Sequence, residues 1–283
     1  MAGMEFDQVV GVDFSGARLA GVNAWVARVA IENDGPAFGR VVELKRLGAL
    51  AGDDERDVSL AHLVDLILES RRTLWGIDFP FALPIEVAPP GAGLGAQLDW
   101  VSAFGGDAYA FGRACVATAQ SIGTAMHIRR QTDRETKTPF DCYHYRIICQ
   151  TFHGMRQVIR PLRASRRTLI PPFDKPRAFD RAVVESCPGS TLKRWAVPHN
   201  NYKQPTGGPL EPKRVRNRRL ILQKIREYVV LDDVFARIIG RNPGGDALDA
   251  VIAAVGAWQA WRTHDLKAIA RHPRYAREGM IFA

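Results

Sequence analysis

The amino-acid sequence predicts an α/β fold built on a mixed β-sheet with helices on its faces. Three apolar, β-branched segments follow one another with short, turn-like connections, at residues 8–14, 22–32 and 40–47. Their close succession predicts an antiparallel meander. Residues 58–68 then carry apolar side chains at helical spacing, and residues 73–79 form a fourth apolar segment. Because a connecting helix allows the next strand to run parallel to its neighbour, we expect parallel strands beside the meander.

Residues 85–170 depart from this pattern and predict a helical insertion after the fourth strand, within one domain that spans residues 1–283. Inside the insertion, residues 98–122 and 141–160 have helical character, the second segment only as far as Pro161. The later elements are predicted to be a fifth strand at 182–186, helices at 212–230, 233–239 and 246–263, and a short last strand at 279–283.

The composition is that of a globular protein with a basic surplus. The chain has 283 residues, of which 46% are hydrophobic and 24% charged, and its formal net charge is +9. This charge permits binding to phosphates, nucleic acid or an acidic membrane face without choosing among them. The N-terminus has no signal-peptide pattern, no apolar run reaches the ~20 residues that span a bilayer, and the four cysteines form no close pair. We expect a cytoplasmic protein without a membrane partner, and no motif indicates its oligomeric state.

Acidic residues fall at the ends of the predicted strands and at the start of a late helix. Asp13 lies in GVDFSG, Asp78 in GIDFPF and Glu185 in VVESCP, each among apolar residues. Asp246 and Asp249 are three residues apart and therefore share one helix face. A buried carboxylate is costly unless it is protonated or paired with a cation, and these motifs contain no lysine or arginine. A hard divalent cation, Mg²⁺ or Mn²⁺, is the simplest neutralising partner.

Each acid also has a structural interpretation. Asp246 and Asp249 fit a helix N-cap followed by an acid in the first turn. Asp13 could cap a turn, and Asp78 could accept hydrogen bonds from backbone amides at a strand end. Glu185 could pair with an arginine of the insertion. Taken together, acids at three strand ends and on a late helix favour a shared metal site.

These pieces resemble the ribonuclease H-like fold, in which acids on the first strand, the fourth strand and a C-terminal helix bind two metal ions. An acidic pair on the final helix resembles the Holliday-junction resolvase branch of that fold. More closely, the chain resembles uncharacterised-domain family 429, described as predicted ribonuclease H-like nucleases. The motifs that carry this resemblance span nearly the whole chain, at residues 11–17, 76–84, 129–140, 150–162, 183–190, 242–254 and 278–282.

The resemblance implies a metal-dependent nuclease that hydrolyses DNA or RNA by a two-metal mechanism. It implies Asp13, Asp78, Asp246 and Asp249 as catalytic metal ligands. Glu185 is a further catalytic candidate from its position in the sequence, because an acid on the fifth strand is not a general feature of the wider fold. In this scheme Asp13 bridges two Mg²⁺ or Mn²⁺ ions, Asp78 holds one of them, and Asp246 or Asp249 holds the other. Asp78 is a shorter side chain than the glutamate often found at this strand in resolvases.

Basic residues predict a surface that neutralises the phosphates of a nucleic-acid partner. For the segment 212–230 the alternative is a solvated basic helix face. The candidate contacts are Arg129, Arg130, Arg156, Arg160, Lys213, Arg214 and Arg218. Four further side chains could stack bases or orient water but are more typical of structural packing: His144, Tyr145, His153 and Tyr202.

Two other functions stay open at the level of the sequence. One is a nucleic-acid-binding protein whose acidic site is not used in catalysis. The other is a nucleotide-dependent phosphotransferase of the actin and sugar-kinase fold, because residues 13–16 superficially resemble its first phosphate-binding turn. That fold needs a second lobe with its own glycine-rich turn, and the sequence contains no such repeat.

Overall fold

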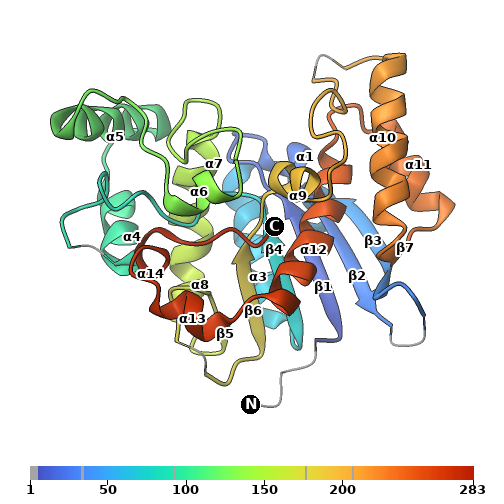
Figure 1. Ribbon diagram of the computed structural model, residues 1–283, viewed down its shortest axis with the longest axis horizontal. Coiled ribbons are helices and arrows are strands. Elements are labelled where there is room, and N and C mark those ends of the chain that lie inside the picture. Colours follow the sequence, from blue (N-terminus) through green and yellow to red (C-terminus); the bar gives the residue numbers. More distant parts are fainter. Residues whose placement is uncertain (1–5, 33–34, 92, 176, 206) are drawn as a thin grey trace.

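The computed structural model describes residues 6–32, 35–91, 93–175, 177–205 and 207–283. These residues form a seven-stranded mixed sheet with the strand order β5-β6-β4-β1-β2-β3-β7, and helices cover both faces of the sheet (Figure 1). The α/β class and the mixed, helix-flanked sheet that the sequence predicts are confirmed.

The meander is formed by β1 (Gln8–Asp13), β2 (Trp25–Ile31) and β3 (Gly39–Arg46), which pair antiparallel as predicted. A short helix, α1 (Ala20–Asn23), lies between the first two strands, so β2 begins three residues later than the sequence suggested. The fourth predicted strand, β4 (Thr73–Ile77), lies on the other side of β1 and runs parallel to it.

Parallel strands continue the sheet beyond β4. The predicted fifth strand is β6 (Arg181–Glu185), which pairs with β4. Two edge strands, β5 (Thr168–Leu169) and β7 (Val229–Val230), have only two residues each. They were not predicted, because two residues are too short for an alternating pattern. The predicted last strand is reduced to a single bridge between Ile281 and Glu185.

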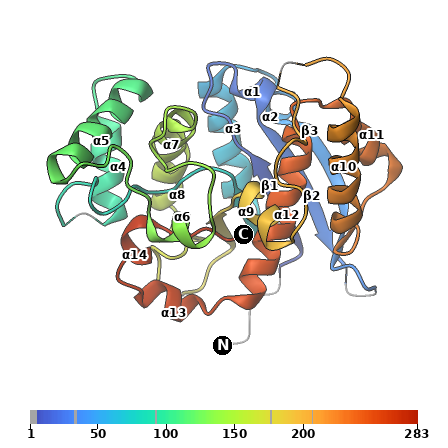
Figure 2. The same cartoon turned by 45° about the horizontal axis from the view of Figure 1, so that its top comes forward.

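One face of the sheet is covered by α12 (Asp246–Thr263), which contacts β1, β2 and β4. Beside it lie α9 (Pro188–Arg194), α10 (Pro212–Ile225) and α11 (Asp233–Arg241), whose apolar side chains join the same core (Figure 2). The helix predicted over residues 212–230 ends at Ile225, because the chain after it turns to pair β7 with β3.

The other face is covered by α3 (Arg56–Glu69) and by most of the segment between β4 and β6. The predicted helix over 98–122 is two helices, because Gly105 and Gly106 lie in the break between them. The other helical elements that precede β5 in the chain are α2 (Leu47–Ala51), α4 (Leu94–Ala103), α5 (Ala108–Ile122), α6 (Gln131–Glu135), α7 (Ile148–His153), the π-helical η1 (Gly154–Ile159) and α8 (Arg160–Ala164).

The helical path does not stop at Pro161 as predicted, because Pro161 lies in the first turn of α8, where its missing N–H costs no bond. After α12 the chain forms α13 (Leu266–Arg271) and α14 (Tyr275–Glu278). Within the described ranges, no helix combines the length and the apolar character that crossing a bilayer requires.

The closest approach between α12 and the sheet occurs at two glycines. Gly11 of β1 and Gly76 of β4 are partners in the parallel register. A Cβ on Gly11 would lie 2.0 Å from the carbonyl oxygen of Ala250, and a Cβ on Gly76 would lie 2.6 Å from the Cβ of Ala257. Only glycine at both positions lets the backbone of the helix reach the strands.

We predict that Gly11→Ala lowers the free energy of unfolding by about 3 kcal/mol or more, because overpacking here forces the helix off the sheet. Gly95→Ala is the control, since Gly95 is exposed on α4 with open space around it. The control is expected to change stability by less than about 1 kcal/mol. Urea unfolding of both variants measures the difference, and equal stabilities would contradict the packing described here.

Candidate functional site

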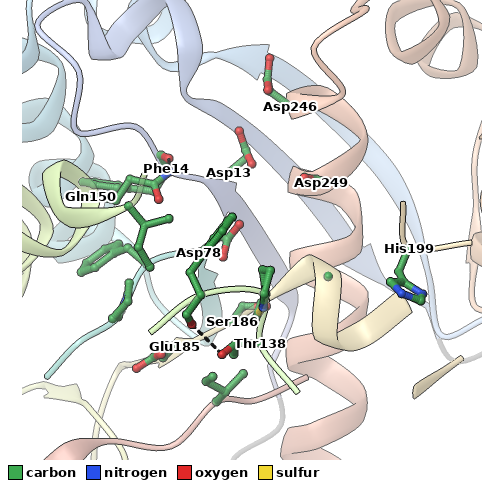
Figure 3. Close-up of a pocket in the computed structure, with 18 of the residues that line it drawn as sticks. Asp13, Phe14, Asp78, Thr138, Gln150, Glu185, Ser186, His199, Asp246 and Asp249 are labelled. Carbon is green, nitrogen blue, oxygen red and sulfur yellow. Dashed lines mark hydrogen bonds between the residues drawn. The ribbon is translucent and has the colours of Figure 1, made fainter. Parts of the chain in front are cut away.

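A cavity of about 520 Å³ opens where β1, β4 and β6 end and α12 begins. Its lining includes all five acids predicted from the sequence, Asp13, Asp78, Glu185, Asp246 and Asp249 (Figure 3). They meet because the carboxyl ends of parallel strands share one edge of a sheet, where ligand sites of α/β proteins commonly lie. The structure therefore brings the five acids to the lining of one cavity.

Asp13 and Asp78 face the first turns of α12. Side chains alternate along a strand, so each aspartate points to the same side as the glycine two residues before it. Gly11 and Gly76 are the positions at which α12 touches the sheet. The Gly-x-Asp pattern therefore occurs in both strands for the same reason. The glycine leaves room for α12, and the aspartate two residues later faces the N-terminal end of that helix.

The first turn of α12 supplies the other two acids. Gly245 occupies the N-cap with φ 90°, and Asn242 Oδ1 accepts a hydrogen bond from the Ala247 N–H. Neither Asp246 nor Asp249 caps the helix, so the N-cap part of the structural interpretation is wrong, whereas both acids do lie in the first turn. Asp249 is buried among the other acids, whereas Asp246 is half-buried at the rim and accepts a hydrogen bond from Asn242 Nδ2.

The carboxylates in this cavity repel one another in a poorly solvated space. Burial raises the pKa of Asp13 well above its ordinary value; Lys203 opposes the rise, and the nearby acids add to it. Burial and repulsion from Asp249 raise the pKa of Asp78 to about 7, again opposed by Lys203. Burial also raises the pKa of Asp249. The positive charge present in the cavity is thus too small to keep all of its acids ionised.

That positive charge comes from a residue that the sequence analysis missed. The ammonium group of Lys203 forms an ion pair with Asp249, and the hydroxyl of the adjacent Tyr202 donates to Asp249 Oδ1 at 2.9 Å. Both lie in the connection between α9 and α10. No local pattern marks Lys203, because only the tertiary fold brings this connection to the acids. The hydrogen bond to Asp249 gives Tyr202, an aromatic candidate in the sequence, a place in the site.

Arg218 holds this connection in position. Its guanidinium is buried and donates to the backbone carbonyl oxygens of Tyr202 at 2.6 Å, Ile239 at 3.0 Å, Asn242 at 2.8 Å and Pro243 at 2.7 Å. It therefore joins the loop that carries Lys203 to the loop that precedes α12. The prediction that Arg218 contacts nucleic acid is wrong, because the guanidinium is enclosed and bonded to the protein itself.

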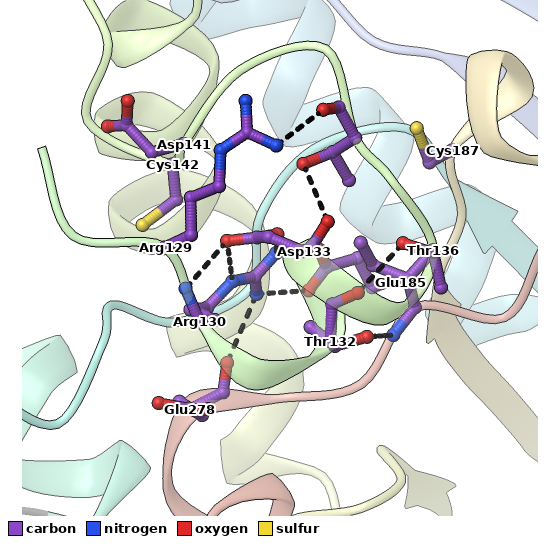
Figure 4. Close-up of polar contacts among 12 residues, drawn as sticks. Arg129, Arg130, Thr132, Asp133, Thr136, Asp141, Cys142, Glu185, Cys187 and Glu278 are labelled. Atoms are coloured by element: carbon purple, nitrogen blue, oxygen red, sulfur yellow. Dashed lines mark hydrogen bonds and ion pairs between the residues drawn. The ribbon is translucent and has the colours of Figure 1, made fainter.

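Glu185 is neutralised by an arginine, as its structural interpretation proposed (Figure 4). Arg130 Nη1 lies 2.8 Å from Glu185 Oε2, and Arg130 Nη2 lies 2.8 Å from Asp133 Oδ1. The backbone N–H of Phe81 also donates to Glu185. Arg130 is only 1% exposed, so the prediction that it contacts nucleic acid is wrong. Glu185 is a structural partner of Arg130 rather than a free ligand.

The strand register explains why Glu185 differs from the aspartates. Glu185 of β6 is the partner of Ile77 in β4, and partners in a parallel register point to the same side of the sheet. Asp78 is the next residue after Ile77 and points to the opposite side. Glu185 therefore projects away from α12, toward the segment that carries Arg130.

Of the seven basic residues predicted to bind nucleic acid, Arg130 alone is part of the cavity lining. Arg129 donates to the carbonyl oxygens of Thr138 and Pro139, and Arg214 pairs with Glu211. Three of the seven predicted basic residues are exposed on the protein surface and do not line the acidic cavity: Arg156, Arg160 and Lys213.

The donor set of the cavity suits a hard divalent cation. Asp13, Asp78, Asp246 and Asp249 outnumber the single ammonium of Lys203, and carboxylate oxygens are preferred ligands of Mg²⁺ and Mn²⁺. Within the described residues, no three His, Cys, Asp or Glu side chains stand close enough together to hold an ion as they are. Binding would thus require these carboxylates to turn toward one another and Lys203 to leave Asp249.

Comparisons with family models, with curated proteins and with solved structures find no match to this chain.

We predict opposite stability effects for two acids of the cavity. Asp78→Asn raises the free energy of unfolding of the metal-free protein at pH 8 by about 1–2 kcal/mol, because it removes a charge that the site disfavours. Glu185→Gln lowers it by about 3 kcal/mol, because it breaks the buried pair with Arg130. Urea unfolding in the presence of a chelator measures both, and a loss of stability in Asp78→Asn would contradict the account.

The same shift predicts a pH dependence. The folded protein holds a proton on Asp78 up to about pH 7, whereas the unfolded chain releases it near its ordinary value of 3.8. Between these values the folded state binds more protons, so this group lowers stability as pH rises toward 7. Asp78→Asn should therefore show a shallower decline than the unaltered protein between pH 5 and 8, and parallel curves would overturn this assignment.

We also predict that Lys203→Met destabilises the metal-free protein and makes it more responsive to Mn²⁺. The Asp249 side chain is 3% exposed, but that of Lys203 is 41% exposed. We therefore expect the free energy of unfolding to fall by about 1–2 kcal/mol, which is less than the loss expected for a fully buried ion pair. Mn²⁺ should raise the melting temperature of this variant by more than that of the unaltered protein, since the ion replaces the missing charge. Lys267→Met on exposed α13 is the control, and equal Mn²⁺ responses in all three proteins would refute the prediction.

Proposed function

We propose that this protein is a metal-dependent nuclease with a ribonuclease H-like core. The observation that carries the proposal is the cavity in which Asp13, Asp78, Asp246 and Asp249 converge. Among the described residues, only Lys203 forms an ion pair with one of these four aspartates. An acidic cluster of this kind is disfavoured in the free protein, so a ligand of opposite charge is expected to bind there.

The topology supports the ribonuclease H-like part of the proposal. An antiparallel meander is followed by a strand parallel to the first, and a late helix brings acids to the ends of both parallel strands. This is the arrangement that the sequence resemblance implied. The phosphotransferase alternative has less support, because the described residues contain one sheet and not the two that its paired lobes need.

Asp13, Asp78 and Asp249 would hold the ion, with Asp246 beside them at the rim. When bound, a divalent cation supplies Lewis-acid chemistry at a phosphodiester and lowers the pKa of water. Tyr202 donates to Asp249 and thereby fixes the orientation of its carboxylate. Because Lys203 is partly exposed, its ammonium can turn from Asp249 toward a phosphate oxygen in the cavity.

The surplus of positive charge supports nucleic acid as the substrate class. Lysines and arginines exceed acids by nine in the whole chain. Lys203 and the partly exposed Arg129 lie at or near the cavity and would offset the charge of a bound phosphate. A polyanionic substrate would accordingly be drawn to the same edge of the sheet that carries the acids.

The direct test is titration of the protein with Mn²⁺ by calorimetry, followed by cleavage assays on single-stranded, duplex, hybrid and branched substrates. Asp13→Asn and Asp249→Asn should each weaken Mn²⁺ binding at least tenfold and abolish Mn²⁺-dependent cleavage. Asp65→Asn is the matched control, because Asp65 is exposed on α3, on the far face of the sheet.

Cleavage by Asp13→Asn and Asp249→Asn at the rate of the control would refute the nuclease proposal. Binding of nucleic acid without Mn²⁺ binding or cleavage would favour the non-catalytic nucleic-acid-binding alternative.

A further inference from the structure

A second cavity, of about 560 Å³, lies beyond the acidic one, at the far half of α12. It is formed by α12, the ends of α9 and α10, and the connection between β2 and β3. Its lining combines aromatic and basic side chains, namely Phe38, Trp195, Tyr228 and Trp258 with Arg194, Lys224 and Arg262. None of these residues takes part in the acidic site.

The aromatic side chains form two stacked pairs. Phe38 and Trp258 have ring centroids 5.2 Å apart with an interplanar angle of 27°, and Trp195 and Tyr228 have centroids 5.4 Å apart at the same angle. All four rings are partly exposed in the wall of the cavity instead of closed within the core. Their exposed parts give the wall of the cavity an aromatic surface against which a further planar ring can pack.

The charge around these rings is positive. The Arg262 guanidinium lies 5.5 Å from the centre of the Trp258 ring, and the Lys224 ammonium lies 5.3 Å from that of Tyr228. Lys224 also pairs with Glu227, but no acidic residue of the described chain lines the cavity itself. A polyanion complements this surface, whereas an apolar segment would leave the charge of Arg262 without a counter-charge. The exposed aromatic rings favour a polyanion that also carries planar groups.

A basic path connects the two cavities along α9. The helix begins beside the acidic cavity, whose lining includes Cys187 and Gly189, and it ends at the aromatic cavity with Arg194. A third, smaller cavity lies against this helix, and its lining includes Lys137, Lys193 and His199. His199 also lines the acidic cavity. Lys137, Lys193 and Arg194 therefore place positive charge between the two sites.

We propose that the aromatic cavity is a subsite for single-stranded nucleic acid, which stacks bases there while its backbone follows α9 to the acids. The inference rests on the proposed function, because it assigns the acidic cavity to the scissile phosphate. Nine residues of α12 separate Asp249 from Trp258, or about 14 Å at 1.5 Å per residue, and Arg262 lies about 6 Å farther. A strand that keeps the spacing of about 3.4 Å per nucleotide found in a duplex spans this distance with roughly four to six nucleotides, and a more extended strand needs fewer.

Aromatic rings combined with a positively charged groove are the usual means by which proteins bind single strands without reading sequence. Stacking on Trp258 and Trp195 brings a base against an indole, so binding should quench tryptophan fluorescence. Duplex nucleic acid keeps its bases paired and stacked, so it cannot use this surface in the same way. The proposal therefore requires a preference for single strands.

The test measures binding of fluorescein-labelled dT12 and rU12 to the full chain, in a chelator at fixed salt, by anisotropy. The double variant Arg194→Ser/Arg262→Ser should bind at least tenfold more weakly, and its affinity should depend less on salt, because two phosphate contacts are lost. The matched control is Arg113→Ser/Arg166→Ser, which removes the same charge from exposed positions outside all three cavities. The dT12 and rU12 arms distinguish DNA from RNA as the source of the strand.

A second measurement separates stacking from charge. Trp258→Leu keeps an apolar side chain but removes the ring, and it should weaken dT12 binding and reduce fluorescence quenching while the circular dichroism spectrum is unchanged. Equal affinities of the two double variants, or duplex binding as tight as single-strand binding without quenching, would overturn the inference. These measurements contain no divalent ion, so failure of the nuclease proposal in the Mn²⁺ titration is observed independently of this result.

Discussion

The contact between α12 and two glycines in the sheet is the constraint on which the rest of the structure depends. Gly11 and Gly76 are register partners, and at each a methyl group would collide with the helix. The helix can therefore lie against the backbone of two adjacent parallel strands. Its first turn is thereby brought to the ends of those strands, where Asp13 and Asp78 face it. The acidic cavity is a direct consequence of this packing.

The same packing creates an electrostatic cost that the protein offsets only in part. Lys203 neutralises Asp249, yet burial still raises the pKa of Asp13 and of Asp78. On the other side of the sheet, Arg130 forms ion pairs with both Glu185 and Asp133, so each of these two buried acids has a cationic partner. Buried acids that all have cationic partners are typical of a structural role. Buried acids that lack such partners are typical of a site that binds a cationic ligand. The contrast between the two networks assigns them different roles.

Much of this fold could be predicted from local patterns. The meander, β4, β6 and α12 are long enough for periodicity to reveal them, and the acids at their ends follow directly. What could not be predicted depends on register and on long-range contacts. Glu185 pairs in register with Ile77 and not with Asp78, so its side chain points away from α12. This register is known only once β6 is paired with β4. Arg130 and Arg218 look like surface cations until their buried partners are known, and nothing near Lys203 in the sequence links it to Asp249.

We propose that the acidic cavity binds a divalent cation and that the Lys203–Asp249 ion pair breaks when it does. Anomalous diffraction at the manganese edge from crystals grown with Mn²⁺ tests it most directly. The account predicts an anomalous peak bounded by Asp13, Asp78 and Asp249, with the Lys203 ammonium moved away from Asp249. A cavity without a peak at saturating Mn²⁺, with Lys203 still paired to Asp249, would contradict it.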